Sequence, residues 1–328
     1  MKLHFEPNLD YQLQAVESVC DLFRGQEACR TEFTVTIRSG TAEPANDLFP
    51  GAVPQQLTLG IAESDLGIGN RLTLLDDEVL KNLGDIQLRN GLPPSTALAS
   101  GDFTVEMETG TGKTYVYLRT IFELNKRYGF TKFVIVVPSV AIKEGVYHTI
   151  ETAGEHLKGL YAGTPFDFFI YDSSKLGQVR NFATSPQIQV MVMTVGAINK
   201  FGDEHQAETE ETDEVARRDK SKNVMYRPSE KTGGEKPIDL IRATRPILIV
   251  DEPQSVEGGL DGKGKRAMER MNPLCNLRYS ATPKEAHHMV FKLDAVDAYE
   301  RKLVKQIEVA AASCVQQGAV AERSVTAF

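Results

Sequence analysis

A glycine-rich turn, Thr-Gly-Thr-Gly-Lys-Thr at 109–114, constrains the fold of this 328-residue chain more than any other feature. A β-like apolar run comes before the turn, and a helical pattern follows it. Gly110 and Gly112 would let backbone N–H groups wrap a phosphate chain, and the N-terminus of the helix would add its partial positive charge. Lys113 would reach the β- and γ-phosphates, and the Thr114 hydroxyl would ligate Mg²⁺. The turn therefore predicts a phosphate-binding loop.

One position of this loop departs from the usual pattern. The pattern GxxxxGK[ST] requires glycine at position 107, where this chain has Met107. The alternative interpretation is a glycine-rich turn that precedes a helix and binds nothing. The strand–loop–helix context favours the phosphate loop over that alternative.

Short apolar segments alternate with helical ones after residue 100, as is typical of a parallel sheet covered on both faces. Helices are predicted from 113 and from 139. The predicted strands are 102–107, 132–137, 166–171, 188–194, 246–250 and 275–280. We therefore expect an α/β fold with a doubly wound, mainly parallel sheet.

Two regions stand apart from this alternation. Apolar side chains at helical spacing predict a helix over 10–24, before Gly25, and another over 76–89; both belong to an N-terminal region of about residues 1–100. Residues 202–236 contain almost no apolar side chain, and their acidic cluster is followed by a basic stretch. This segment is predicted to be a solvated, mobile insertion loop. A regulatory or DNA-contacting role for its basic half is the alternative.

The second motif, RPILIVDEPQ (245–254), puts Asp251 and Glu252 at the carboxyl end of a buried strand. Ligands bind at that end in open α/β sheets. Asp251 can hold the Mg²⁺ that a nucleotide brings, and Glu252 can orient and deprotonate the attacking water. An acidic pair after a strand is often plain surface. Its place downstream of a phosphate loop favours the catalytic interpretation.

The third motif, LRYSATPKE (277–285), ends an apolar run with Ser280 and Thr282. Small hydroxyls at a strand end can relay hydrogen bonds between a nucleotide site and a neighbouring domain, although such a turn in isolation is uninformative. His287 and His288 have no acidic or cysteine partner at ligand spacing, so a surface or core pair is favoured over a metal site.

Composition excludes some classes of protein. The net charge of −8 argues against binding nucleic acid by bulk charge, but it leaves room for a local basic groove. No run approaches the roughly 18 apolar residues of a membrane span, and the first residues lack the apolar stretch of a signal peptide. We expect a cytoplasmic protein without a membrane partner. The spacing of Cys20, Cys29, Cys275 and Cys314 fits no zinc pattern and no disulfide framework, which predicts reduced thiols.

Taken together, the order ETGTGKT, DEPQ and SAT resembles the first motor domain of a superfamily 2 helicase. FEPNLDYQ (5–12) falls where such proteins carry an adenine-reading glutamine. From about residue 5 to about 309 the chain resembles, more narrowly, the restriction (Res) subunit of type III restriction–modification enzymes. The segments that carry this resemblance are METGTGKTYVYLRTIFELNKRYGF (107–130), VIVVPSVAIKEGV (134–146), DEPQSVEGGLDGKGKRAMERMNPL (251–274), LRYSAT (277–282) and LDAVDAYERKLVKQIEV (293–309).

The resemblance implies a RecA-like P-loop NTPase domain that binds ATP with Mg²⁺. Gln12 would read the adenine edge, because a side-chain amide can donate and accept at once. Asp251 would be the metal-linked acid and Glu252 the hydrolytic base. The phosphate loop would comprise Gly110, Thr111, Gly112, Lys113 and Thr114. Lys113 and the two acids would form the catalytic set, with Thr114 and Asp251 on the metal ion.

The resemblance also implies where DNA would be contacted. Pro138, Ser139 and Thr194 fall where the family's first motor domain touches DNA phosphates. Ser280 and Thr282 would couple the state of the ATP to the DNA. Backbone amides and hydroxyls make such contacts without net positive charge, so an acidic chain is compatible with DNA binding. The residue after the Ser-Ala-Thr turn is proline here, where the family commonly has histidine.

In the family, ATP drives DNA translocation or switching that licenses cleavage. The implied partners are double-stranded DNA and a modification (Mod) methyltransferase subunit. Complete relatives continue into a second motor domain, which supplies an arginine for phosphoryl transfer, and into a nuclease domain. We therefore expect an N-terminal region (1–100), a helicase ATP-binding domain (101–290) and a truncated connection (291–328), with slow hydrolysis by the isolated chain.

Three alternatives stay open beside this interpretation. The first is a non-catalytic truncated remnant, or an interaction module that binds the modification subunit or DNA. The second is a nuclease site built from Asp251, Asp261 and Lys263, which is disfavoured because a glycine-rich loop stands where a strand is needed. The third is a small-molecule kinase, which the DEPQ and SAT motifs disfavour.

Overall fold

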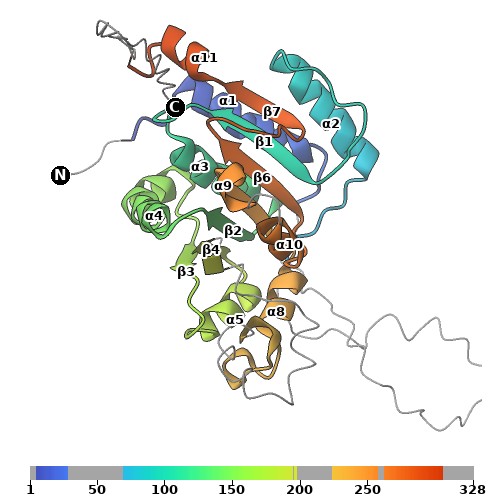
Figure 1. Ribbon diagram of the computed structural model, residues 1–328, viewed down its shortest axis with the longest axis vertical. Helices are drawn as coiled ribbons and strands as arrows, with labels where there is room; N and C mark the ends of the chain where they lie inside the picture. Colours follow the sequence, from blue (N-terminus) through green and yellow to red (C-terminus); the bar gives the residue numbers. More distant parts are fainter. Residues whose placement is uncertain (1–4, 29–68, 195, 198–223, 258–261, 306–328) are drawn as a thin grey trace, which may run out of the picture.

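The computed structural model describes residues 5–28, 69–194, 196–197, 224–257 and 262–305, and these residues form a seven-stranded sheet in the order β3-β4-β2-β5-β6-β1-β7. All neighbouring strands are parallel. The strands are β1 (Asp102–Met107), β2 (Lys132–Val137), β3 (Phe166–Ile170), β4 (Ile188–Thr194), β5 (Ile247–Asp251), β6 (Cys275–Ser280) and β7 (Met289–Leu293). β3 and β7 lie at opposite edges of the described sheet (Figure 1). The doubly wound parallel sheet that the alternating pattern predicts is confirmed.

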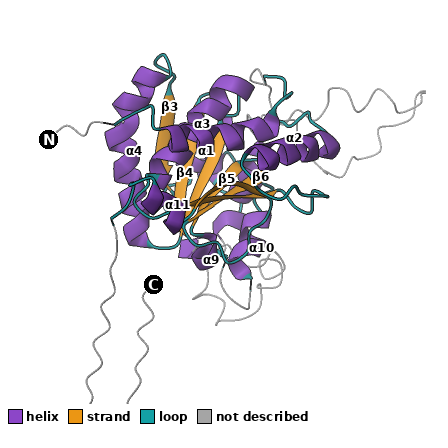
Figure 2. Cartoon of the chain, turned by 90° about the horizontal axis from the view of Figure 1, so that it is seen from above, coloured by secondary structure: helices purple, strands orange, loops and turns teal. Residues whose placement is uncertain are grey.

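Helices cover both faces of this sheet (Figure 2). The first face is covered by α1 (Asp10–Cys20), α2 (Asp76–Arg89), α3 (Lys113–Tyr128) and α4 (Val140–Leu160). The second face is covered by α5 (Gly177–Thr184), α8 (Pro237–Thr244), α9 (Pro253–Val256) and α10 (Lys263–Glu269). A short helix, α11 (Ala295–Glu300), follows β7. Among the described residues, no helix combines the length and the apolar content that crossing a membrane requires.

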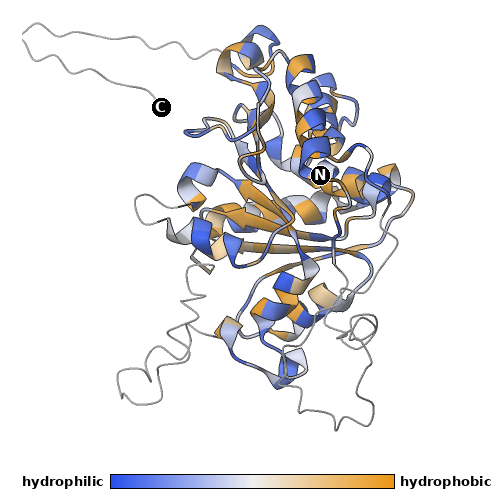
Figure 3. Ribbon diagram, turned by 90° about the vertical axis from the view of Figure 1, so that its right-hand side faces the viewer, coloured by the Kyte–Doolittle hydropathy of each residue, from blue (hydrophilic) through white to orange (hydrophobic). Residues whose placement is uncertain are grey.

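The central strands are apolar on both faces, as Figure 3 shows by their hydrophobic colour. In β2, Phe133 and Ile135 pack in the core on the first face, whereas Val134 and Val136 pack in the core on the second face. This follows from the period of two along a strand, because successive side chains point to opposite sides. A strand buried on both faces therefore has a continuous apolar sequence rather than an alternating one.

The six strands predicted from sequence are all present, within about one residue at their ends. The sequence did not predict β7, because its residues follow a polar stretch and form only a short apolar run. β7 pairs with β1 through a register shift between Thr104 and Val105. The sheet consequently extends to Leu293, past the domain boundary expected at 290.

The helical predictions in the N-terminal region also hold. The helix expected over 76–89 is α2, with the same ends. The helix expected over 10–24 is α1, continued by the 3-10 turn η1 (Asp21–Phe23), and the chain leaves it at Gly25, whose φ of 96° suits glycine. Both helices pack on the first face of the sheet, with α1 against α3 and α2 beside β7. The N-terminal region and the sheet thus share one hydrophobic core.

The charged segment expected to be a solvated loop over 202–236 is only partly described. Its residues 202–223 lie outside the described part of the chain. Residues 224–236 differ from the expectation, because they contain the 3-10 turns η3 (Val224–Tyr226) and η4 (Glu230–Thr232). Met225 and Tyr226 are buried in the core of the second face. Two apolar side chains are enough to fix the end of a segment that is otherwise polar.

The predicted thiols fit the structure where it describes them. Cys20 and Cys275 are free and buried, whereas Cys29 and Cys314 lie outside the described residues. Burial raises the pKa of the Cys275 thiol to about 12. These two cysteines therefore act as small core residues.

His288 is a partly buried residue whose two ring nitrogens both have partners inside the protein. Its Nε2 accepts a hydrogen bond from the Ala99 N–H at 3.0 Å, so Nδ1 must carry the proton toward the Ser95 hydroxyl, 3.1 Å away. Burial lowers the pKa of His288, and the charge of Asp102 opposes part of that shift. The imidazole is therefore held in its neutral form, between the segment that leads into β1 and the start of β7.

We expect His288 to make the protein less stable in mild acid. Because the pKa of His288 is lower in the folded state, the unfolded state binds more protons below about pH 6.5, so the free energy of unfolding falls as the pH drops through that value. The His288→Gln variant should lose this contribution, which we expect to be below about 1 kcal/mol for a partly exposed group. Urea unfolding at pH 7.5 and 5.5 measures it, with exposed His148→Gln as the control. An unchanged pH dependence in His288→Gln would contradict the assignment.

Candidate functional site

The three motifs meet at the carboxyl ends of three neighbouring strands. β5, β6 and β1 are adjacent, and their carboxyl ends lie level with one another, since Asp251 pairs with Tyr279 and Glu106 pairs with Ser280. The phosphate loop follows β1, the acidic pair ends β5, and the Ser-Ala-Thr turn ends β6. Strand order therefore brings together side chains that lie far apart in the sequence. In Figure 1, α3 and α9 leave the sheet at the carboxyl ends of the strands.

The loop has the backbone that a phosphate site needs. Gly110 and Gly112 adopt φ angles of 85° and 91°, a region that favours glycine. Gly112 caps α3, which begins at Lys113, so free N–H groups of the first helical turn face the loop. Met107 is the last residue of β1, and its side chain is fully buried in the core. The departure at position 107 is thus explained, because a core side chain occupies it and the loop turns after it.

Lys113 links the loop to the acidic pair. Its ammonium forms a short ion pair with Glu252 Oε1 and lies 3.2 Å from Asp251 Oδ1. The Lys113 side chain is 15% exposed and that of Asp251 is 7% exposed, so these charges interact with little screening by water. The two carboxylates thus hold the lysine that a phosphate would attract.

Glu252 is held by several contacts. Its Oε2 accepts a hydrogen bond from Gln254 Nε2 at 2.7 Å and one from the Ser280 hydroxyl at 3.0 Å. Burial by itself would raise the pKa of Glu252, but the hydrogen bonds from Lys113, Gln254 and Ser280 lower it overall. Its backbone has φ 54° and ψ 65°, a left-handed conformation that costs a non-glycine residue about 1–3 kcal/mol. The surrounding contacts offset that strain and keep the carboxylate ionised.

Asp251 is the more deeply buried acid of the pair. Burial raises its pKa, and Lys113 opposes part of that shift. Its buried Oδ1 faces the Lys113 ammonium and accepts no hydrogen bond from any other described residue. Thr114 lies in the first turn of α3, beside Lys113. Among the described residues, no group of three His, Cys, Asp or Glu side chains could hold a metal ion. These residues fit Mg²⁺ only as part of a nucleotide complex, in which phosphate oxygens and water complete the ligands.

Gln12 lies against the phosphate loop. Its Nε2 donates to the Thr111 carbonyl at 3.0 Å, and the neighbouring Tyr11 hydroxyl donates to the same oxygen, also at 3.0 Å. A Cβ atom on Gly112 would lie 2.5 Å from Gln12 Nε2, so the amide packs directly on the glycine. The structure thus brings Gln12 to the loop, with part of its donor capacity used inside the protein. Sequence reasoning missed Tyr11, although it directly precedes Gln12.

Ser280 and Thr282 have different positions. The Ser280 side chain is fully buried and touches Glu252, whereas Thr282 is exposed and donates its N–H to the Ser280 hydroxyl at 3.1 Å. The Ser280 hydroxyl also lies 3.1 Å from Gln254 Oε1. Gln254 thus bridges the acidic pair and the Ser-Ala-Thr turn, a role that sequence reasoning did not assign. Its place in DEPQ was the only signal for it.

The residues expected to contact DNA also lie at the carboxyl ends of strands, but on other strands of the sheet. Pro138 and Ser139 follow β2, and Thr194 ends β4, its neighbour in the sheet, where it pairs with Val137. Ser139 is exposed and caps α4, accepting a hydrogen bond from the Ile142 N–H at 3.3 Å. Thr194 accepts one from the Ala197 N–H at 3.3 Å. These three residues lie together, beyond β5 from the phosphate loop.

The described residues do not support the alternative nuclease site. Lys263 begins a helix, α10, and not the strand that such a site needs. Asp261 lies outside the described residues. Asp251 is already paired with Lys113.

Comparison with known proteins shows one family. The family model described as "Type III restriction enzyme, res subunit" matches residues 77–285. A type III restriction-modification enzyme Res subunit of Escherichia coli is 30% identical over 281 residues, which cover 80% of this chain and 27% of that relative. The Res subunit of Escherichia phage P1 is 27% identical over 323 residues, with coverage of 92% and 28%. That of Salmonella typhimurium is 31% identical over 238 residues, with coverage of 62% and 22%.

The chain spans about a quarter of the length of these relatives. Among solved structures, the SWI2/SNF2 ATPase core of Sulfolobus solfataricus in complex with double-stranded DNA gives a TM-score of 0.33 at 14% identity, covering 62% of this chain and 31% of that one. The assignment rests instead on the family match and on the strand order. The family model covers more than half of the chain. The chain belongs to the family of type III restriction enzyme Res subunits, and its described part is a RecA-like P-loop NTPase domain.

Proposed function

We propose that this chain is the ATP- and DNA-binding motor domain of a type III restriction enzyme Res subunit, in which ATP hydrolysis drives movement along double-stranded DNA. The observation that carries the proposal is the contact of Lys113 with Glu252 and Asp251, because it joins the phosphate loop to an acidic pair. In P-loop NTPases, the lysine of the phosphate loop and the acid that holds Mg²⁺ act together on the β- and γ-phosphates.

Each residue has a role in this proposal. Lys113 and the N–H groups of the loop bind the β- and γ-phosphates, while Thr114 and Asp251 hold Mg²⁺ with them. Glu252, kept ionised by its hydrogen bonds, accepts a proton from the attacking water. Gln12 would read the adenine edge with its Oε1, because its Nε2 already donates to the Thr111 carbonyl and to the Tyr11 hydroxyl. Mg²⁺, when bound, neutralises the charge that develops on the phosphates.

Coupling to DNA would pass through the Ser-Ala-Thr turn. The Ser280 hydroxyl contacts Glu252, and the Thr282 N–H donates to that hydroxyl. A movement of Glu252 that accompanies a change at the phosphates would therefore shift Ser280 and then Thr282. Pro138, Ser139 and Thr194 would bind DNA phosphates with hydroxyls and backbone amides. The modification methyltransferase subunit would be the protein partner, because the relatives are Res subunits of restriction–modification enzymes. This function places the protein in the cytoplasm.

An equilibrium titration tests the proposal. We expect a fluorescent ATP analogue to bind the purified chain with Mg²⁺ present and to bind at least tenfold more weakly when EDTA removes the metal. Fluorescence anisotropy measures both affinities. Binding that ignores Mg²⁺, or no binding by a folded chain, would contradict the proposal and favour a module that keeps the fold without the chemistry.

A further inference from the structure

The turn that carries Glu252 contacts strand β6 at both of its ends. At the near end, the Glu252 N–H donates to the Tyr279 carbonyl on β6 at 2.9 Å. The turn then forms α9 (Pro253–Val256) and ends at Glu257, whose N–H donates to the Pro253 carbonyl at 2.8 Å. A left-handed residue such as Glu252 persists only where its surroundings leave no alternative. The contacts at the far end of the turn therefore matter for the position of the Glu252 carboxylate.

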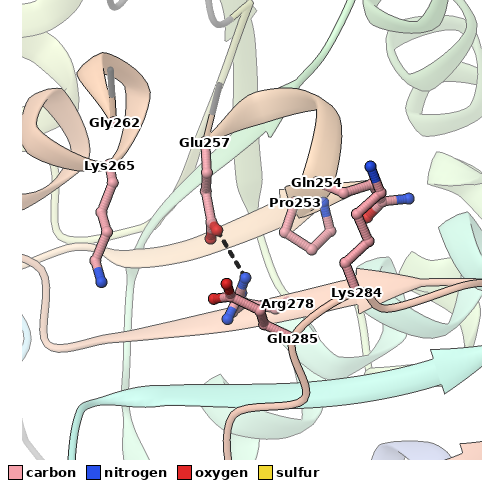
Figure 4. Close-up of a pocket in the computed structure, with 8 residues that line it drawn as sticks. All are labelled: Pro253, Gln254, Glu257, Gly262, Lys265, Arg278, Lys284 and Glu285. Carbon is pink, nitrogen blue, oxygen red and sulfur yellow. Dashed lines mark hydrogen bonds and ion pairs between the residues drawn. The ribbon is translucent and has the colours of Figure 1, made fainter. Parts of the chain in front are cut away.

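Arg278 holds that far end. It lies on β6 two residues before Ser280, so both side chains project from the same face of the sheet. The Arg278 side chain is only 4% exposed, and its Nη2 lies 2.7 Å from Glu257 Oε2. Figure 4 shows this contact between α9 and β6. A buried arginine needs a charged partner, and breaking such a pair leaves the other charge uncompensated.

The surroundings of this ion pair differ on its two sides. A cavity of about 330 Å³ borders the ion pair, lined among others by Lys265 and Glu285 (Figure 4). On the other side, α10 packs tightly, because a Cβ atom added to Gly264 would lie 2.2 Å from the Val256 carbonyl oxygen. Among the described residues, the end of α9 is thus held by the buried Val256 side chain, by the backbone of α10 on one side and by the Arg278–Glu257 ion pair beside the cavity on the other.

We propose that Arg278 is a positioning residue, whose ion pair with Glu257 anchors α9 on β6 and thereby keeps the Glu252 carboxylate facing Lys113 and Ser280. The consequence for hydrolysis rests on the function proposed above. The anchoring itself does not, because it concerns the protein without nucleotide. Arg278 touches neither substrate nor metal in this proposal and acts only through Glu257 and the turn.

Hydrogen exchange of the nucleotide-free chain tests the anchoring. In Arg278→Ala and Glu257→Gln we expect the amides of Glu252, Ser255 and Glu257 to exchange at least tenfold faster, with unchanged exchange in β2 and β4. The charge-conserving Arg278→Lys should restore part of the protection. Exposed Glu285→Gln, which lines the same cavity, is the control. Unchanged exchange in the turn, or a uniform increase across the sheet, would show an ordinary stability contact and overturn the proposal.

A second measurement addresses hydrolysis. We expect Arg278→Ala to bind the Mg²⁺–ATP analogue within threefold of the original chain while single-turnover hydrolysis slows at least tenfold, because binding uses the loop and hydrolysis uses Glu252. An equal loss of affinity and of hydrolysis rate, or no loss of either, would overturn the positioning role. If the original chain binds no nucleotide, the proposed function fails, and the exchange experiment still decides whether Arg278 anchors the turn.

Discussion

The Lys113→Ala variant is expected to bind the Mg²⁺–ATP analogue about 10–150-fold more weakly than the original chain, the equivalent of one charge-assisted hydrogen bond of roughly 1.5–3 kcal/mol. Two effects add in the same direction. The variant lacks the ammonium that would contact the phosphates. It also leaves Asp251 and Glu252 unpaired beside the loop, where their charges would repel a polyphosphate. The anisotropy titration described above measures the change.

Lys126→Ala is the matched control for this variant, because Lys126 is an exposed lysine in the last turn of the same helix, α3. Its affinity for the analogue should equal that of the original chain. Removing Lys113 also breaks a partly buried ion pair, so circular dichroism must show that the variant is folded. A folded Lys113→Ala protein with unchanged affinity would mean that the loop does not bind phosphate.

The Glu252→Gln variant is expected to separate binding from hydrolysis. Loss of a general base typically slows the chemical step by about 10²–10⁴-fold. Affinity should be retained or increased, because Lys113 no longer has an anionic partner at this position and is free to contact the phosphates. Glutamine keeps the length and the hydrogen-bonding capacity toward Gln254 and Ser280. Single-turnover hydrolysis and the anisotropy titration measure the two effects.

The control for loss of charge alone is Glu269→Gln, at an exposed position on α10. It should change neither the affinity for the ATP analogue nor the rate of hydrolysis. A Glu252→Gln protein that hydrolyses ATP at the original rate would exclude Glu252 as the base. A parallel loss of affinity and rate would assign Glu252 to binding rather than to proton transfer.

The parts of the fold that follow local patterns could be predicted from the sequence. The strand β2 is a continuous run of apolar residues, and α2 has an acidic first turn and ends before Asn90-Gly91, so both were identified with their ends. β7 was missed, because MVFKL is short and becomes a strand only by pairing with β1. The 3-10 turns within residues 224–236 were missed for a similar reason. Met225 and Tyr226 belong to an apolar run of only three residues, 224–226, and their burial depends on the core of the second face.

The phosphate loop of the candidate site could be predicted from its own residues, because it is a compact motif between a strand and a helix, whereas the acidic pair became informative only by following that loop. Their meeting was only an expectation, derived from the rule that ligands bind at the carboxyl ends of parallel strands. The contacts of Tyr11 with the Thr111 carbonyl and of Arg278 with Glu257 have no signature of their own. An aromatic residue in a helix and an arginine in a strand have too many ordinary roles for the sequence to specify a partner.

The sequence by itself therefore predicted which groups form the candidate site, since Lys113, Asp251, Glu252 and Ser280 could be named with proposed roles from local pattern and family resemblance. Only the tertiary structure decided how these groups are arranged, namely that Lys113 is paired with the acids and that the turn of Glu252 is fixed by Arg278. The physical reason is that motifs are encoded over a few consecutive residues. Ion pairs and strain at the site depend instead on which strands lie side by side, and that is set by the packing of the whole sheet.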